Sequence, residues 1–370
     1  MNIALIEPQC TGLQHVPFNA SLLESISLAM PDANLAFSGE AAHVAFVREA
    51  LGNGAGREIA WRSDFGGMVR AGGVGGWPGL WSGARQLSEY CRKENIDVLI
   101  LCSSPPELLA AVELMRPRST AVIVVLHACL AGLHFNPVTQ LVRNPLSIHA
   151  VARLPVPHGV RVVVLGEPIL ANLKAMGLAS ARWESIDHPR SGDAEEAVIP
   201  PSPPVRFGYL AGFERSDSRT REMFERVSKE TGCVVNWIGR DSPGSEALAP
   251  EEYKKRLRES HYAVWLGDAR AAQLRASATF LDAISMGKPL IYLKNDFIDY
   301  YQTSRGAFGF PVSSIEEMER LAIRLALAPI DDCYMRKAET ALDVSRSFFP
   351  ENIAPRLRML IAGAQTETTK

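Results

Sequence analysis

The sequence predicts an α/β protein made of two domains, each a parallel β-sheet covered by helices. Two observations lead to this prediction. Short apolar runs alternate with amphipathic helical segments along the whole chain, a pattern typical of β–α–β units. The alternation stops once, at residues 200–204, where four of five residues are proline, and then starts again. A proline-rich stretch forms a stiff, extended connector, so we expect the domain boundary there.

Composition narrows the class of protein. The 370 residues are 47% hydrophobic and 22% charged, with a formal net charge of -2. This balance suits a soluble globular protein and argues against a general nucleic-acid binder. No apolar run of about 18 residues is present, as a membrane span would need. The six cysteines and eight histidines show no metal-ligand spacing, and the first residues predict a strand, not a signal peptide. We therefore expect a cytoplasmic, metal-free protein.

In the first half, apolar runs predict strands at residues 3–6, 33–37, 58–61, 97–102, 121–126 and 162–165. Helices are expected at residues 21–30, 41–51, 79–93, 105–115 and 169–176. Ser21 and Glu24 fit a capping box for the first of these helices. Because ligands of such sheets bind beyond the carboxyl ends of the strands, the loops there are the candidate functional segments.

Two of these loops carry candidate residues. Residues 8–19 form a long loop after the first strand, rich in Gly, Pro, His and Asn, and include Gly12 and His15. His15 fits a packed loop histidine as well as a functional one. The strand at residues 121–126 ends in His127, which on its own pattern fits a histidine hydrogen-bonded to backbone.

Residues 66–76 contain six glycines in eleven residues, which indicates a mobile loop. No Gly-Lys-Ser/Thr follows, so the segment is not a P-loop. Trp77, Leu80 and Trp81 come directly after it. They predict either an amphipathic rim that faces a membrane or a lipid-linked acceptor, or tryptophans packed beneath the loop.

In the second half, strands are predicted at residues 205–209, 234–238, 263–266 and 290–293. Helices are predicted at residues 218–229, 250–260, 277–286 and 314–327, with a terminal helix in residues 348–362. The segment 277–293 is the most informative. Ser277 and Thr279 can cap its helix, Gly287 fits a left-handed C-cap, and Pro289 ends the helix before a buried strand. The segment is either an ordinary helix–strand unit or a phosphate site at the helix N-terminus, which includes Ala278.

Residues 282–291, Asp-Ala-Ile-Ser-Met-Gly-Lys-Pro-Leu-Ile, resemble the second half of the donor-site signature of GT-B glycosyltransferases, especially the family-4-like group. The resemblance implies that Asp282 holds the nucleotide ribose. The first glutamate of the signature falls on Leu274, so that half is missing. Residues 212–219 are similar to the Gly-Arg…Lys turn of the family, which grips the diphosphate. Phe213 replaces its Arg, Arg219 takes the Lys position, and Arg215 lies between them.

The family also suggests roles for other positions. His127 matches a histidine that lies against the donor sugar and the reacting phosphate, although Ala128 replaces the Asp that often follows it. Gly12 matches a glycine loop near the donor. The strand at 234–238 with Gly239 and Arg240 is similar to a turn beneath the nucleotide base. Arg275 is placed to assist the diphosphate.

Taken together, the resemblance implies a GT-B fold, in which two Rossmann-like domains face a cleft and the terminal helix crosses back to the first domain. The expected bounds are 1–199, a linker at 200–204, 205–347 for the donor domain, and 348–370. We expect a glycosyltransferase of polysaccharide biosynthesis that moves a sugar from a UDP or GDP donor to a glycan, lipid-linked or small-molecule acceptor. It would need no cofactor and would be cytoplasmic, with peripheral membrane contact through the rim.

Two alternatives stay open. One is a GT-B binding protein without catalysis, which Leu274 and Phe213 favour because the family has ionic groups at both positions. The other is a sugar-nucleotide epimerase of the same fold. A transferase that inverts stereochemistry would need a carboxylate base from the first domain, whereas a retaining one would need no protein base.

Overall fold

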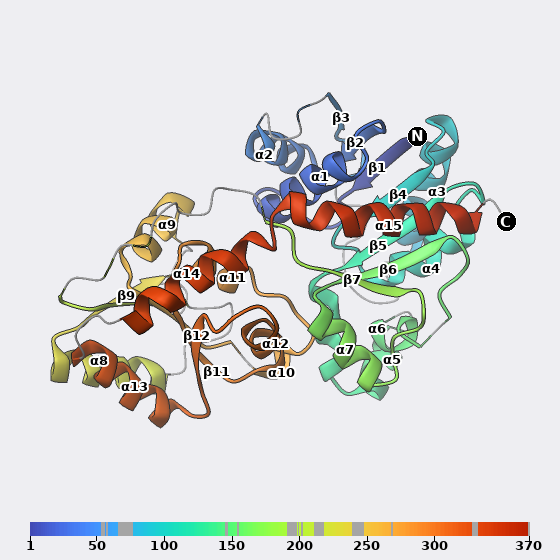
Figure 1. Ribbon diagram of the computed structural model, residues 1–370. Helices are drawn as coiled ribbons and strands as arrows, with labels where there is room; N and C mark the ends of the chain where they lie inside the picture. Colours follow the sequence, from blue (N-terminus) through green and yellow to red (C-terminus); the bar gives the residue numbers. More distant parts are fainter. Residues whose placement is uncertain are drawn as a thin grey trace. The chain divides into compact units, whose positions relative to one another are not determined.

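The computed structural model describes residues 1–52, 56, 58–65, 77–144, 147–153, 155–190, 198, 200, 203–210, 218–238, 248–267, 269–327 and 332–368 (Figure 1). The chain divides into two compact units. Unit 1 comprises Met1–Ser191, Leu274–Ala276 and Phe348–Lys370, and unit 2 comprises Gly192–Gln273 and Ser277–Ser347. The first segment of unit 1 therefore ends at Ser191, ahead of the expected boundary at residue 199, and the proline stretch falls within the span of unit 2.

Unit 1 is built on a seven-stranded sheet with the order β3-β2-β1-β4-β5-β6-β7. Every neighbouring pair is parallel. The strands are β1 (Asn2–Ile6), β2 (Asn34–Ser38), β3 (Ile59–Arg62), β4 (Val98–Leu101), β5 (Ala121–Leu126), β6 (Val160–Leu165) and β7 (Trp183–Ile186). All of β5 is buried, as expected for a strand covered on both faces. The sequence predicted the first six strands but not β7, which is short and lacks a continuous apolar run.

The helices of unit 1 are α1 (Val16–Ala29), α2 (Ala41–Leu51), α3 (Trp77–Lys93), α4 (Pro106–Met115), α5 (Pro137–Arg143), α6 (Ile148–Val151) and α7 (Glu167–Ala175), with a 3₁₀ segment η2 (Ala128–His134). The predicted capping box is wrong, because α1 begins at Val16 and its N-cap is His15. Ser21 lies inside the helix, where its hydroxyl donates to the carbonyl of Pro17 at 2.7 Å. Pro17 suits the first turn, since its missing N–H is not needed there.

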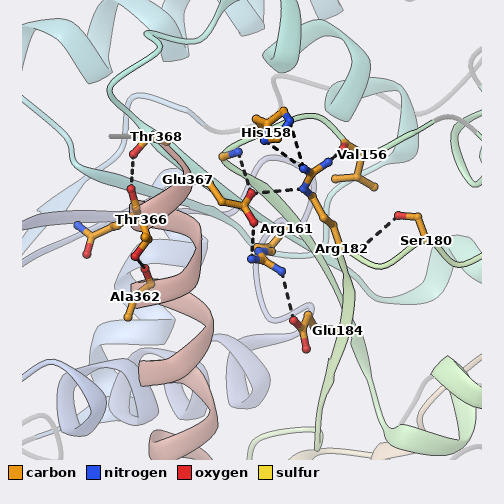
Figure 2. Close-up of polar contacts among 12 residues, drawn as sticks. Val156, His158, Arg161, Ser180, Arg182, Glu184, Ala362, Thr366, Glu367 and Thr368 are labelled. Atoms are coloured by element: carbon orange, nitrogen blue, oxygen red, sulfur yellow. Dashed lines mark hydrogen bonds and ion pairs between the residues drawn. The ribbon is translucent and has the colours of Figure 1, made fainter. Parts of the chain in front are cut away.

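The last helix, α15 (Pro350–Thr368), returns to unit 1 and packs against α1, as the sequence predicted (Figure 1). Its apolar side chains Ile353, Leu357 and Ile361 are part of the core of unit 1. Near its end, Glu367 contacts Arg161 at 2.5 Å and Arg182 at 3.3 Å, and it accepts a hydrogen bond from the Gly159 N–H at 3.2 Å (Figure 2). These contacts attach the helix end to the beginning of β6 and to the residue before β7.

Unit 2 contains a five-stranded parallel sheet with the order β12-β11-β10-β8-β9. Its strands are β8 (Arg206–Leu210), β9 (Val234–Ile238), β10 (Tyr262–Trp265), β11 (Leu290–Leu293) and β12 (Gly309–Val312). Its helices are α8 (Ser218–Thr231), α9 (Pro250–Glu259), α10 (Ala269–Ala272), α11 (Ala278–Ser285), α12 (Asp296–Ser304), α13 (Ile315–Leu327) and α14 (Asp332–Arg346). The sequence did not predict β12, α10, α12 or α14. The predicted α/β class with two parallel sheets is confirmed.

Each sheet has a point where the strand order reverses. In unit 1 it lies between β1 and β4, and in unit 2 between β8 and β10. Loops that leave neighbouring strands there run in opposite directions and open a crevice beyond the carboxyl ends of the strands. The candidate site residues are therefore those that follow these strands.

Candidate functional site

Glu7, directly after β1, anchors the loop at the switch point of unit 1. Glu7 is fully buried. Oε1 accepts hydrogen bonds from the N–H groups of Gln9 and Cys10, both at 3.0 Å, and Oε2 accepts one from Asn19 Nδ2 at 3.0 Å. Hydrogen bonds to an ionised carboxylate are stronger than neutral ones, so Glu7 fixes the course of the loop.

Two side chains at the start of α2 hold the backbone of Gly12 in place. Its carbonyl accepts from His43 Nδ1 at 2.9 Å, and its N–H donates to Glu40 Oε2 at 3.2 Å. Gly12 has a φ of 53°, which favours glycine at this turn. The structure therefore gives Gly12 a role in the geometry of the loop, and its contact with a donor stays a prediction.

His15 and Ser103 meet at the switch point. Each has a left-handed backbone, with φ of 55° and 43°, although neither is glycine. Such conformations cost about 1–3 kcal/mol and are concentrated at functional sites. His15 Nδ1 lies 3.0 Å from Ser103 Oγ and 3.4 Å from Cys10 Sγ. The β1 and β4 loops thus bring a histidine, a hydroxyl and a thiol together.

His127 and His188 extend the cluster along the carboxyl edge of the sheet. The ring of His127, after β5, lies with its centroid 4.2 Å from that of His15. Nε2 of His127 is 3.4 Å from Nε2 of His188, which follows β7. Phe18 packs against both rings, with centroid distances of 5.2 Å and 5.1 Å. Three imidazoles therefore form one continuous group.

All three imidazoles are neutral at pH 7. Burial lowers the pKa of His188 to about 4. Burial also holds the pKa of His127 well below its usual value. The repulsion that its protonated ring would feel from protonated His15 or His188, and from Arg275, lowers this pKa further. Burial lowers the pKa of His15 too, although the negative charge of Glu7 opposes this. A neutral imidazole can accept a proton or a hydrogen bond, so the group is suited to acid–base chemistry.

Sequence reasoning singled out only His15 and His127 from this cluster. It did not assign roles to Glu7, Asn19, His43, Ser103 or His188. Three of these missed residues, Glu7, Ser103 and His188, share with His127 a signal that the sequence does contain. Each of them lies within two residues of a strand end. What the sequence lacked was the strand order, which puts the ends of β1, β4 and β5 next to one another and the end of β7 one strand further along the same edge.

In unit 2, the N-terminus of α11 is built as predicted. Ser277 Oγ accepts from the Phe280 N–H at 3.2 Å and from Trp265 Nε1 at 3.0 Å. Thr279 Oγ1 lies 3.1 Å from the same hydroxyl. Trp265 folds back over Gly267, where a Cβ would lie only 2.1 Å from the indole ring. The first-turn N–H groups of Ala278 and Thr279 precede the intrahelical hydrogen bonds and point out of the helix end.

The other end of α11 also matches its pattern, because Gly287 has a φ of 61° and the strand β11 follows. Asp282 lies one turn into the helix and is half-buried. Its Oδ2 accepts from the hydroxyl of Tyr253 in α9 at 3.1 Å. A carboxylate has about four acceptor positions, so it can accept several hydrogen bonds at once. The role of Asp282 as a ribose ligand stays a prediction.

The remaining predicted donor residues are differently placed. Arg275 belongs to the short segment Leu274–Ala276 of unit 1, in which Leu274 is fully buried. Arg219 is exposed in the first turn of α8. The pKa of Glu316 in α13 is lowered mainly by hydrogen bonds from its own backbone N–H and from Ser314, and the charge of Arg219 adds a smaller effect. Phe213, Arg215, Gly239 and Arg240 lie outside the described residues.

The predicted apolar rim is wrong for Leu80, which is only 3% exposed. The helix α3 turns this side chain toward the core, while Trp81 is half-buried and the Trp77 side chain lies outside the described residues. Among the helices that the structure describes, none is both long and apolar enough to cross a bilayer. No described group of three or more His, Cys, Asp and Glu side chains is arranged to hold a metal ion. None of the six cysteines forms a disulfide bond with another described cysteine.

No protein-family model matches the sequence, and no curated protein does either. Solved structures do match the fold. A glycosyltransferase from Rickettsia africae aligns with a TM-score of 0.63 at 12% identity, over 100% of this chain and 98% of that chain. Anabaena HepE, solved with UDP-glucose, aligns with a TM-score of 0.58 at 13% identity, over 97% and 98%. A UDP-N-acetylglucosamine 2-epimerase aligns with a TM-score of 0.52 at 11% identity, over 96% and 94%. The chain therefore has the GT-B fold that the sequence predicted.

Proposed function

We propose that the protein is a glycosyltransferase that moves a sugar from a nucleoside-diphosphate donor to a hydroxyl acceptor. The observation that carries this proposal is the group of neutral histidines beside buried Glu7 at the switch point of unit 1. This group lies on a fold shared with glycosyltransferases, one of which was solved with UDP-glucose. Fold and site chemistry thus support the same class of reaction.

The donor diphosphate is assigned to the N-terminus of α11. The N–H groups of Ala278 and Thr279 and the positive end of the helix dipole favour an anion there. Arg275 stands two residues before the N-cap Ser277 and adds a cation. Asp282 would bind the ribose, and Arg215 and Arg219 would assist the diphosphate. These donors neutralise the charge that develops on the leaving diphosphate, so the reaction needs no metal ion.

His15 is the candidate general base. When its Nδ1 donates to Ser103 Oγ, the lone pair is on Nε2 of a ring that is partly exposed. The acceptor hydroxyl would give its proton to this nitrogen as its oxygen bonds to the anomeric carbon. The bond from that carbon to the diphosphate breaks, and its electron pair leaves with the phosphate. Glu7 favours the imidazolium that forms, because its charge raises the pKa of His15. This arrangement corresponds to inversion and replaces the carboxylate base that the sequence did not identify.

The test is release of UDP or GDP from a panel of nucleotide sugars, measured with and without a chelator, together with calorimetry of the nucleotides. We expect one nucleoside diphosphate to bind at least tenfold more tightly than its monophosphate, with no effect of the chelator. Affinity that disappears with the chelator would contradict the assigned donor site. Binding without any turnover would favour a GT-B protein that has lost catalysis.

A sugar-nucleotide epimerase is the second candidate. Its supporting observation is the same cluster, since Glu7, His15, His127 and His188 provide several groups that can take up or release protons. An epimerase of the same fold is also among the matching structures. The products separate the two reactions: a transferase yields a nucleoside diphosphate and a glycosylated acceptor, whereas an epimerase yields an isomeric sugar without an acceptor.

A further inference from the structure

The hydrogen bonds of His127 and His188 determine which of their ring nitrogens carry protons. His188 Nδ1 lies 2.9 Å from the carbonyl oxygen of Pro189. A carbonyl oxygen can only accept a hydrogen bond, so this nitrogen must carry the proton. The low pKa of His188, caused by burial, keeps its ring neutral at pH 7. Its Nε2 is therefore an acceptor without a proton.

The state of His188 determines the tautomer of His127. The two Nε2 atoms are 3.4 Å apart, and only His127 can donate across this distance. His127 is also neutral at pH 7, because burial and the nearby positive charge of Arg275 disfavour its protonated form. With its single proton on Nε2, its Nδ1 carries an unprotonated lone pair.

That lone pair has no partner. Nδ1 of His127 is buried and forms no hydrogen bond with the part of the chain that the structure describes. An unpaired buried acceptor costs about 1–3 kcal/mol, and native proteins keep such a group where a ligand or a water supplies the donor. The rings of His15, Phe18 and His188 all lie beside the His127 ring, and none of them donates a hydrogen bond to its Nδ1. No side chain or backbone group of the described residues supplies the missing donor, which leaves Nδ1 available to a ligand.

We propose that His188 is a positioning residue that holds His127 in the Nε2–H tautomer, so that Nδ1 of His127 accepts a hydrogen bond from a sugar hydroxyl. The sugar rests on the proposed function, whereas the tautomer does not. A hydroxyl fits this nitrogen because it can donate. The diphosphate of a sugar nucleotide does not, since its oxygens carry no proton at pH 7 and would face a lone pair. His127 therefore contacts the sugar and not the phosphate.

The first test is long-range ¹H–¹⁵N spectroscopy of the ¹⁵N-labelled full chain, with the His127 signals identified by their loss in His127→Gln. We expect His127 protonated on Nε2 in the unmodified protein. His188→Gln keeps an acceptor near the same place and should keep this tautomer. His188→Leu removes the acceptor and should make the Nδ1–H form at least several-fold more populated. Phe18→Leu, the control, changes packing against both rings without removing the acceptor and should leave the tautomer unchanged.

A proton on Nδ1 in the unmodified protein would overturn the proposal, as would a His188→Leu spectrum with an unaltered tautomer. If His188→Leu does not fold, the spectra of the unmodified protein and of His188→Gln decide by themselves, since both must show the Nε2–H form.

The second test compares the affinities of UDP and UDP-glucose by calorimetry. UDP-glucose should bind the unmodified protein more tightly than UDP. His188→Leu should reduce this advantage about fivefold to tenfold, the worth of one neutral hydrogen bond, and His188→Gln should retain it. The affinity for UDP should stay the same in all three proteins. Equal losses for both ligands in His188→Leu would overturn the sugar contact. If the protein binds GDP in place of UDP, the same comparison is made with GDP and the GDP-sugar that binds. A protein that binds neither nucleotide and none of their sugars would contradict the proposed function and the sugar contact with it, while the tautomer measurement would still stand.

Discussion

At the scale of single residues, His15 combines a left-handed backbone with a ring that is held on one side by Ser103 and Cys10. The loop around it is fixed by Glu7, whose carboxylate accepts two backbone N–H groups. The strain and the buried charge both have a physical cost, and neither contributes to the apolar core. Their combination is the reason to place the general base here.

His15→Gln should lower kcat by about 10²–10⁴ and leave the affinity for UDP unchanged, because glutamine can hydrogen-bond but cannot take up the proton. Steady-state kinetics and calorimetry measure the two quantities. The control is His149→Gln, which alters another buried histidine of unit 1, bonded to the Phe135 carbonyl outside the cluster. A His15→Gln enzyme with full kcat would exclude His15 as the base.

The stability of the protein should fall as the pH drops from about 7 toward 4. The unfolded chain binds a proton at His188 near pH 6.5, whereas the folded chain does so only at about pH 4. The stabilisation is therefore complete above this window and is lost through it, by roughly 3 kcal/mol for His188 alone. Urea unfolding at several pH values, compared with His188→Gln, measures the difference. Equal pH dependence of the two proteins would contradict a neutral buried His188.

Asp282→Asn should weaken binding of a nucleoside diphosphate about tenfold or more, because a charged acceptor for ribose hydroxyls is worth roughly 1.5–3 kcal/mol. Tyr253→Phe is the matched variant. It removes the hydroxyl that donates to Asp282 and keeps the carboxylate. We expect Tyr253→Phe to change the Tm more than the affinity. If both substitutions lower the Tm and neither changes the affinity, Asp282 is a structural residue.

At the scale of elements, the helix α11 shows how side chains from other elements fix the helix end to which we assign the donor diphosphate. Trp265, from the end of β10, donates its indole N–H to the N-cap Ser277, and Gly267 leaves room for the ring. At the other end, Gly287 combines a φ of 61° with a Cβ position only 3.2 Å from Leu342 in α14. A helix of 8 residues has few hydrogen bonds of its own, and contacts from neighbouring elements fix α11 at both ends.

Gly287→Ala should destabilise unit 2 by about 1–2 kcal/mol, since a left-handed conformation is costly for any residue with a Cβ. The added methyl group would also press against Leu342. Gly363→Ala is the comparison. Gly363 lies inside α15, where the nearest atom to an added Cβ is 3.5 Å away, so alanine should be neutral or stabilising. Thermal unfolding of both variants gives the answer, and equal effects would contradict the strained position of Gly287.

At the scale of the whole molecule, neither unit is one continuous stretch of sequence, because unit 1 consists of three segments and unit 2 of two. The end of the chain belongs to unit 1, and α15 buries Ile353, Leu357 and Ile361 in the core of that unit. Glu367 then contacts Arg161 and Arg182, side chains more than 180 positions earlier in the sequence (Figure 2). The core of unit 1 therefore depends on residues that are far apart in the sequence.

Glu367→Gln should reduce the free energy of unfolding by about 2 kcal/mol, because hydrogen bonds to charged groups are worth roughly 1.5–3 kcal/mol each and Arg161 retains a partner in Glu184. Chemical denaturation measures the loss. Glu351→Gln, an exposed change in the first turn of the same helix, should stay within about 0.5 kcal/mol. A loss as small as that for Glu367→Gln would mean that apolar packing alone holds α15.

The sequence by itself determined the α/β class, the parallel strands and the structure of α11. These features depend on local patterns: apolar runs such as residues 121–126, a serine N-cap at Ser277 and a glycine at Gly287. It also singled out His127 at the end of its strand. Only the tertiary structure decided the order of the strands. That order makes β1, β4 and β5 neighbours and puts β7 one strand beyond β5, with β6 between them. The ends of these strands lie along one edge of the sheet, which joins Glu7, Ser103, His127 and His188 with His15 into one cluster. The physical reason is that hydrogen bonding between strands and burial of helices are long-range interactions, and no local pattern records which strand will lie beside which.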